Sequence, residues 1–191
     1  MIVDGLMGSQ LNFPKVITAL VAGCNSLLDL GCCDGSTLRQ VSIGERLYVD
    51  IKRRENTPEP FLQADIRDAE KLFKPKSYDV VTALDVIEHL QKVDGWKLIA
   101  DAERIARKRA IFFTPFGPLW TREDNDPDSH HSGWVPSEFE SLGYQTCLWT
   151  EFHKWETGHK HGAFVAWKTL VGTEIKPESM RSVLTSKISG S

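Results

Sequence analysis

The stretch LLDLGCCDGS, residues 27–36, decides the fold, because it has the pattern of a buried strand that runs into a tight loop. Leucines flank a carboxylate, Asp29, and two glycines bracket the short turn that follows. In α/β sheets, ligands bind at this kind of turn between a strand and a helix. The turn also holds adjacent cysteines, Cys32 and Cys33, so a thiol site is the competing interpretation.

The cysteine pattern disfavours that competing interpretation. The chain has four cysteines, which form neither a dense disulfide framework nor a paired CxxC zinc pattern. Neighbouring Cα atoms are about 3.8 Å apart, closer than a relaxed disulfide requires. We therefore expect Cys32 and Cys33 to line a ligand loop without redox chemistry.

Composition limits the classes of protein to which the chain can belong. With 191 residues and 41% hydrophobic content, it can bury one core. No apolar run is long enough to span a membrane, and the start lacks the pattern of a secretory signal, so a cytoplasmic protein is expected. A net charge of −3 indicates no broad nucleic-acid footprint and favours a small-molecule substrate.

Apolar segments with strand character alternate with amphipathic helical segments, which is typical of α/β folds. Seven strands are expected, at residues 26–30, 46–50, 61–65, 78–85, 110–115, 144–149 and 162–170. They predict a Rossmann-like, mostly parallel seven-stranded sheet with helices on both faces. The last two strands lack a helical linker and predict an antiparallel edge hairpin.

One helix is expected between the fourth and fifth strands. Its apolar stripe consists of Val93, Trp96, Ile99, Ala102 and Ile105. We expect one domain over residues 1–172, with a short N-terminal cap that includes a helix around PKVITALVAG, and a flexible tail over residues 173–191.

Three carboxylates end successive strands. Asp29 ends the first, Asp50 follows 21 positions later, and Asp65 ends the third. A dinucleotide fingerprint would need glycines at Cys33 and Ser36, and a phosphate-binding P-loop would need Gly-Lys-Ser/Thr, so neither motif is present. A carboxylate such as Asp50 can accept both hydroxyls of a ribose, and Asp65 can accept an adenine amino group.

Four segments together resemble the class I S-adenosylmethionine-dependent methyltransferases over about residues 26–170. They are LLDLGCCDGS, YVDIK, QADIRD and YDVVTALDVIEHL. The resemblance implies S-adenosylmethionine as cofactor, bound by Asp29, Gly31, Cys32, Cys33, Gly35, Asp50, Ile51, Asp65, Ile66 and Leu84. The family usually has glycine where this chain has Cys33.

Histidines are the expected bases for an oxygen or nitrogen acceptor near neutral pH. The candidate catalytic residues are His89, which follows a strand end, and His130 and His131, in a long segment between the fifth and sixth strands that also holds Phe116, Trp120 and Trp134. His153, His159 and His161 fall on the expected hairpin and are more typical of solvated surface. The acceptor is expected to be a small molecule, and the enzyme a monomer or homodimer.

A divalent metal is a further hypothesis for the acceptor site. Asp85, Glu88 and His89 would share one face if the chain turned into a helix there, and His130 would be the fourth ligand. The pattern is similar to the ExxEH motif and later histidine of small-RNA 2′-O-methyltransferases, and to the ExxEH of ubiquinone-biosynthesis O-methyltransferases. Mixed oxygen and imidazole ligands suit Mg²⁺ or Mn²⁺ loosely. DVIEHL also resembles many metal-independent class I enzymes, in which it turns the chain beside the cofactor.

Two alternatives to a small-molecule enzyme stay open. One is a metal-dependent RNA 2′-O-methyltransferase. The other is a catalytically silent protein that binds S-adenosylmethionine, for which Cys33 in place of glycine is the support.

Overall fold

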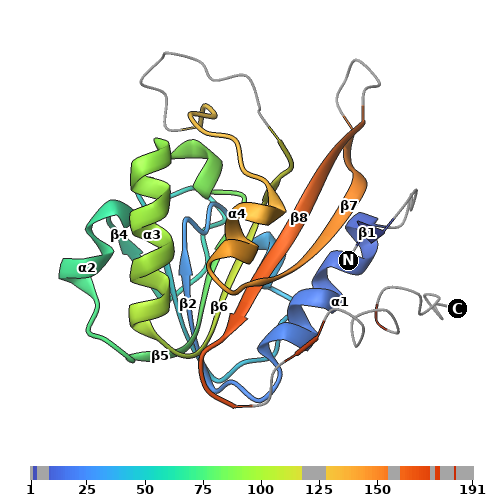
Figure 1. The fold of residues 1–191 in the computed structure, drawn as a ribbon. Helices are drawn as coiled ribbons and strands as arrows, with labels where there is room; N and C mark the ends of the chain where they lie inside the picture. Colours follow the sequence, from blue (N-terminus) through green and yellow to red (C-terminus); the bar gives the residue numbers. More distant parts are fainter. Residues whose placement is uncertain are drawn as a thin grey trace, which may run out of the picture.

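The structure is a computed structural model that describes residues 2–3, 9–117, 128–154, 160–172, 175–176 and 183. Its centre is an eight-stranded sheet with strand order β1-β7-β8-β6-β5-β2-β3-β4 (Figure 1). The strands are β1 Ile2–Val3, β2 Ser26–Leu30, β3 Glu45–Asp50, β4 Phe61–Gln63, β5 Tyr78–Leu84, β6 Ala106–Pro115, β7 Gln145–Lys154 and β8 Lys160–Thr169.

All seven expected strands are present, and the Rossmann-like sheet is confirmed. β8 pairs antiparallel with both β6 and β7, whereas the remaining described pairs are parallel. The added strand, β1, pairs with β7 outside the hairpin. Two residues are too few to show the alternation of a strand, so the sequence pattern does not reveal β1.

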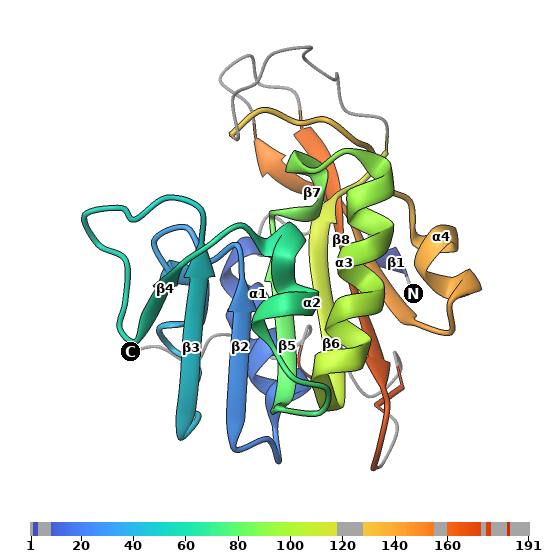
Figure 2. The same ribbon diagram turned by 90° about the vertical axis from the view of Figure 1, so that its left-hand side faces the viewer.

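Helices cover both faces of the sheet, as expected. The α-helices are α1 Ser9–Val21, α2 Ala69–Leu72, α3 Lys92–Ile105 and α4 Pro136–Ser141, and the 3₁₀ turns are η1 Ser36–Leu38, η2 Ile66–Asp68 and η3 Ile87–His89. α1 lies on one face, and α2, α3 and α4 lie on the other (Figures 1 and 2). Neighbouring strand residues alternate between the two cores: Leu27 packs on the α1 side and Leu28 on the α3 side.

The buried face of α3 differs from the expected stripe at its first residue. Leu98, Ile99, Ala102 and Ile105 are buried, but Val93 is 74% exposed. A strict three-residue spacing falls behind the 3.6-residue helical turn at every step, so five residues at this spacing cannot share one face. In the described residues, no helix is both long and apolar enough to cross a membrane.

Part of the C-terminal segment contacts the core. The Trp167 indole N–H donates to the Ile175 carbonyl at 2.7 Å, and Ile175 and Val183 pack against the α1-side core. A carbonyl beyond the end of β8 thus satisfies the buried indole donor of Trp167.

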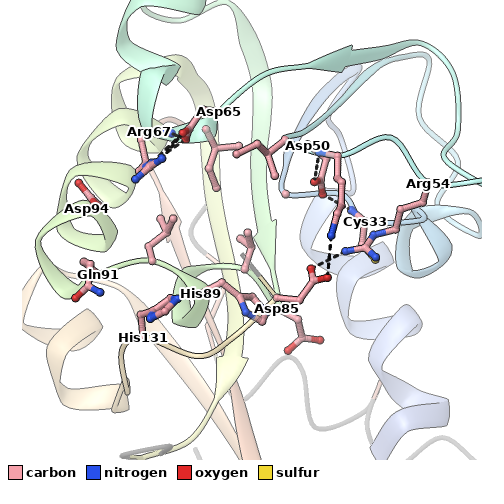
Figure 3. Close-up of a pocket in the computed structure, with 17 residues that line it drawn as sticks. Cys33, Asp50, Arg54, Asp65, Arg67, Asp85, His89, Gln91, Asp94 and His131 are labelled. Carbon is pink, nitrogen blue, oxygen red and sulfur yellow. Dashed lines mark hydrogen bonds and ion pairs between the residues drawn. The ribbon is translucent and has the colours of Figure 1, made fainter. Parts of the chain in front are cut away.

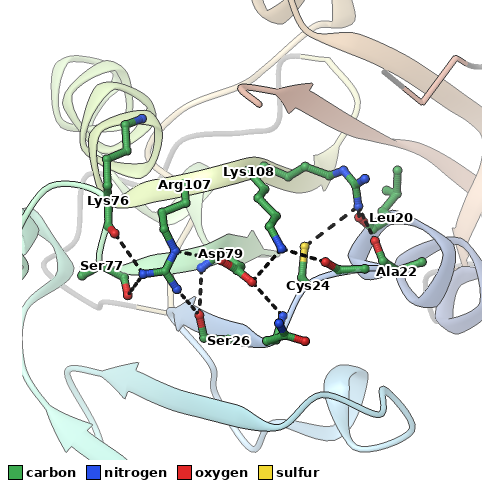
Figure 4. A network of polar contacts seen from close by, with 12 residues as sticks. Leu20, Ala22, Cys24, Ser26, Lys76, Ser77, Asp79, Arg107 and Lys108 are labelled. Atoms are coloured by element: carbon green, nitrogen blue, oxygen red, sulfur yellow. Dashed lines mark hydrogen bonds and ion pairs between the residues drawn. The ribbon is translucent and has the colours of Figure 1, made fainter. Parts of the chain in front are cut away.

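The start of β6 carries Arg107, Lys108 and Arg109, which hold the sheet and α1 together at the edge that contains the amino ends of the parallel strands (Figure 4). Arg109 donates to the carbonyls of Leu20 and Ala22 at 2.7 and 2.8 Å, and Lys108 donates to that of Gly23 at 2.8 Å. These cations satisfy carbonyls at the end of a helix that has no basic residue in its last turn.

Asp79, at the start of β5, is the anionic centre of the same network. Its carboxylate accepts from the Asn25 backbone N–H at 2.8 Å, from Arg107 Nε at 2.8 Å and from Lys108 Nζ at 3.0 Å. The residue is only 5% exposed. Burial by itself would raise the pKa of Asp79, but the Asn25 hydrogen bond and the two cations outweigh it and lower the pKa to about 2.

Asp79→Asn is expected to lower the free energy of unfolding by about 2 kcal/mol at pH 7. The ionised carboxylate of Asp79 is stabilised by its contacts in the folded state and has no such contacts in the unfolded state. The lowered pKa makes this contribution present above about pH 4 and removes it as the pH falls towards 2. Urea unfolding of both proteins at pH 7 and pH 3 measures the difference. A stability gap that is the same at both pH values contradicts the assignment.

Candidate functional site

A cavity of about 700 Å³ lies at the carboxyl ends of the parallel strands (Figure 3). Its lining includes six of the ten residues expected to bind a cofactor: Gly31, Cys33, Asp50, Ile51, Asp65 and Ile66. It also includes His89, His131 and Asp85 from the expected catalytic and metal-binding sets. The sequence patterns did not identify the remaining lining residues: Lys52, Arg54, Arg67, Val86, Leu90, Gln91, Asp94 and Asp128.

The other expected cofactor residues lie outside the described lining. Asp29 is 3% exposed and accepts from the Thr82 hydroxyl at 2.7 Å, and burial raises its pKa to about 7. Cys32 and Leu84 are buried, and Gly35 faces the Pro58 ring. Direct contact of these four residues with a cofactor stays a prediction.

Asp50, at the end of β3, joins the loop after β2, residues 31–36, to the loop that follows β3. One carboxylate oxygen accepts the Cys33 backbone N–H at 2.8 Å, and the other accepts the Lys52 backbone N–H at 3.0 Å. Each oxygen keeps a second lone pair. Asp50 lies in the cavity wall with acceptor capacity left for two ribose hydroxyls, which fits the role expected from the sequence.

Backbone conformation shapes this loop. Gly31 has φ of 80°, and a Cβ there would lie 2.1 Å from the Val86 side chain, so only glycine lets the loop approach the chain after β5. Cys33 has φ of 52°, in the left-handed region that glycine adopts freely. The position at which the sequence resemblance implies glycine therefore keeps the conformation of glycine, with the thiol side chain exposed.

Asp65 lies on the side of the cavity away from Cys33 and is paired with Arg67 (Figure 3). Arg67 Nε lies 3.0 and 2.9 Å from its two oxygens, and the Arg67 backbone N–H donates to it at 2.9 Å. The side-chain hydrogen bonds from Arg67 chiefly lower the pKa of Asp65. An adenine amino group would share this carboxylate with the guanidinium.

Glu88, His89 and His130 form a cluster beside the cavity, with one ligand atom from each within 4.8 Å of the others. Glu88 is 1% exposed, and its carboxylate accepts from the Thr114 hydroxyl at 2.9 Å. Burial, and to a smaller extent the negative charge of Asp85, raise the pKa of Glu88. A carboxylate this deeply buried favours a cationic partner.

His89 is oriented for ligation. Its Nδ1 lies 3.1 Å from the Ser129 carbonyl, which can only accept, so Nδ1 carries the proton and Nε2 carries the lone pair. Nε2 lies 4.0 Å from a Glu88 oxygen. Burial lowers the pKa of His89 and favours the neutral ring. A metal-binding histidine usually has its second nitrogen fixed in this way.

Asp85 does not belong to this cluster. The expected helical face for Asp85, Glu88 and His89 is absent, because Asp85 has φ of 52° and the 3₁₀ turn begins only at Ile87. Asp85 instead lines the cavity.

The segment that carries His130 is held against η3. The backbone N–H groups of His131 and Ser132 donate to the Glu88 carbonyl at 2.8 and 3.0 Å. Trp134 is fully buried against Gly95, where a Cβ would lie 2.4 Å from the indole ring. A glycine within the first turns of an expected helix was the available signal for this close approach.

Histidines of the hairpin do not join the site in the described structure. His161 lies in β8. The side chain of His153 and all of His159 and Trp120 lie outside the described residues.

Asp50→Ala is expected to weaken binding of S-adenosylmethionine, the cofactor that the sequence resemblance implies, by about 2 to 3 kcal/mol or on the order of a hundredfold, because two hydrogen bonds to a carboxylate are lost. Isothermal titration calorimetry measures the affinity. Asp34→Ala is the matched control, since Asp34 caps the same loop at Ser36 but lies outside the described cavity lining. Unchanged affinity in Asp50→Ala excludes the ribose role.

Cys33→Gly is expected to keep or raise cofactor affinity. A non-glycine residue in the left-handed region costs about 1 to 2 kcal/mol, part of which the greater chain entropy of glycine offsets. The control is Cys33→Ala, which removes the thiol but keeps the Cβ and should show no gain. A marked loss of affinity in both variants would instead show that the thiol contacts the cofactor.

Comparison with known proteins agrees with this geometry. The chain matches a family model described as a methyltransferase domain over residues 28–114, which span the loop, the strand-end carboxylates, β5 and most of β6. No curated protein sequence matches the chain.

Solved structures share the fold at low identity. A SAM-dependent methyltransferase from Archaeoglobus fulgidus has a TM-score of 0.55 at 18% identity, covering 81% of this chain and 94% of that chain. The methyltransferase domain of bacterial CtHen1-CN has 0.57 at 19% identity, covering 84% and 99%. The small RNA methyltransferase HEN1 has 0.59 at 15% identity, covering 88% of this chain and 26% of that chain. The family match and the cavity fall on the same segments, so residues 28–114 are a methyltransferase domain, and the fold around them is that of S-adenosylmethionine-dependent methyltransferases.

Proposed function

We propose that this enzyme methylates a hydroxyl oxygen of a small-molecule acceptor, and that Glu88, His89 and His130 hold a divalent cation which positions that hydroxyl. The supporting observation is the cluster itself: a buried carboxylate and two imidazoles, with ligand atoms within 4.8 Å of one another, beside the cofactor cavity. One carboxylate and two histidines suit Mn²⁺, Zn²⁺ or, more loosely, Mg²⁺.

The surroundings of the cluster fit a metal site. Ser129 fixes the tautomer of His89, and Thr114 donates to the carboxylate of Glu88. Such outer contacts orient ligands and raise the affinity of a site. A bound cation would lower the pKa of a coordinated hydroxyl.

The remaining tasks fall to the protein. Methyl transfer from a sulfonium is an in-line displacement, so alignment of the two reactants supplies much of the rate. We assign that alignment to Asp50 and the residue 31–36 loop on the cofactor side. We assign acceptance of the hydroxyl proton to His131, and its position in the cavity lining supports this assignment.

Charge supports a small acceptor over a nucleic acid. The cations in the cavity wall, Lys52, Arg54 and Arg67, are each paired with an aspartate. The net charge of the chain is −3. Phosphate backbones are usually bound by unpaired lysines and arginines.

RNA 2′-O-methylation is the second candidate. The similarity of DxxEH and the later histidine to small-RNA 2′-O-methyltransferases favours it, and the cluster of Glu88, His89 and His130 gives that similarity a spatial counterpart. A terminal ribose presents two adjacent hydroxyls, which suit coordination by one cation.

Removal of metal is expected to lower methyl transfer at least tenfold, because the acceptor hydroxyl would lose its positioning cation. The enzyme is treated with EDTA, after which Mg²⁺, Mn²⁺ or Zn²⁺ is restored, with phenols, vicinal diols and amines as acceptors. His130→Ala should lose metal binding and keep S-adenosylmethionine affinity. His131→Gln should lower turnover and keep metal binding.

Three outcomes would change this proposal. Full activity after chelation, with unchanged metal binding in His130→Ala, rules out the metal site. Methylation of amines alone replaces the oxygen acceptor. Methylation confined to an RNA oligonucleotide with a free 3′-terminal diol, and absent from the 2′-deoxy oligonucleotide, establishes the second candidate.

A further inference from the structure

Two loops meet across the cavity at Asp128. Arg54 Nη2 lies 2.7 Å from one carboxylate oxygen, and Lys52 Nζ lies 3.4 Å from the other. All three residues line the cavity. Figure 3 shows Arg54 reaching from its loop over the cavity. Lys52 and Arg54 follow β3, whereas Asp128 is more than 70 positions away in the chain.

The loop that contributes the cations is tied to the cofactor side. The Lys52 backbone N–H donates to Asp50, the expected ribose ligand. The Arg54 backbone N–H donates to the Thr57 hydroxyl at 2.8 Å, and that hydroxyl donates to the Cys33 carbonyl at 3.3 Å. Arg54 is therefore linked to Cys33 through Thr57, and its neighbour in the clasp, Lys52, is bonded to Asp50.

The residue that contributes the anion is tied to the acceptor side. Asp128 directly precedes Ser129, whose carbonyl accepts from His89 Nδ1. His130 and His131 follow in the same segment. The Asp128 side chain is 50% exposed, so its ion pairs lie on the solvent side of the cavity, whereas the next residue, Ser129, is 8% exposed.

We infer that Asp128 is a positioning residue that clasps the loop after β3 to the segment carrying His130 and His131, so that the cofactor half and the acceptor half of the site are ordered together. Without the clasp, the loop that carries Lys52 and Arg54 becomes ordered only when the cofactor binds. The conformational entropy lost in this ordering then weakens cofactor affinity. For the acceptor half the inference rests on the proposed function; for cofactor affinity it does not.

A double-mutant cycle on Arg54 and Asp128 tests the clasp. Asp128→Asn and Arg54→Gln should each weaken S-adenosylmethionine binding roughly twofold to fivefold, within the range of partly exposed ion pairs. The double variant should lose no more than the weaker-binding single variant, because the two side chains act through one contact. Calorimetry measures affinity, and thermal unfolding confirms that each variant is folded.

Arg53→Gln is the matched control. Arg53 lies between Lys52 and Arg54 in the sequence but pairs with Glu59 within its own loop. The cofactor affinity of Arg53→Gln should therefore equal that of the wild type. Salt should weaken cofactor binding more in the wild type than in Asp128→Asn, since only the wild type has screenable clasp pairs. Wild-type affinity in Asp128→Asn, additive losses in the double variant, or an equal loss in Arg53→Gln would each overturn the inference.

Mn²⁺ binding, followed by electron paramagnetic resonance, reads out the acceptor half. In the wild type, the cofactor should tighten Mn²⁺ binding, and Asp128→Asn should reduce this coupling at least threefold. If Mn²⁺ binds to no variant, the proposed metal site fails, and the cofactor affinities still decide whether the clasp exists. If Mn²⁺ binds with full coupling in Asp128→Asn, the clasp does not reach the acceptor half.

Discussion

The position of the segment that carries His130 and His131 depends on one backbone contact, in which the carbonyl of Glu88 accepts the N–H groups of His131 and Ser132. The contact joins a 3₁₀ turn after β5 to a segment more than forty positions later. Trp134 secures the junction by filling the space that Gly95 leaves open on α3. A carbonyl and two amides carry the contact, so it does not depend on the side chains of Glu88 and His131.

Two residues in the cavity wall have a left-handed backbone conformation, which residues other than glycine rarely adopt. Cys33 and Asp85 have positive φ at the ends of β2 and β5, respectively, and both line the cavity. Residues in such conformations persist when their surroundings hold them, and they cluster at functional sites. Asp50 holds Cys33 through its backbone amide, and the Asp85 amide donates to the Phe113 carbonyl at 2.8 Å.

Stability and chemistry occupy opposite edges of the sheet. At the amino ends of β2 and β5, Arg107 and Lys108 bind the Asp79 carboxylate, and Arg109 donates to a carbonyl at the end of α1. At the carboxyl ends, the polar groups line a cavity and keep acceptor capacity. Parallel strands bring all their carboxyl ends to one edge, so a single arrangement supplies both the anchoring edge and the ligand edge.

The sequence by itself determined the seven main strands, the loop after β2 and the carboxylates that end β2 and β3, because alternation, glycine and charge are local signals. It also marked Glu88, His89 and His130 as candidates, but on a helical face that the structure replaces with a left-handed Asp85 and a 3₁₀ turn. Only the tertiary structure decided that Asp128 meets Arg54, and that Ser129 sets the tautomer of His89. These contacts join residues 40 or more positions apart, and no periodicity in the chain encodes a pairing between loops.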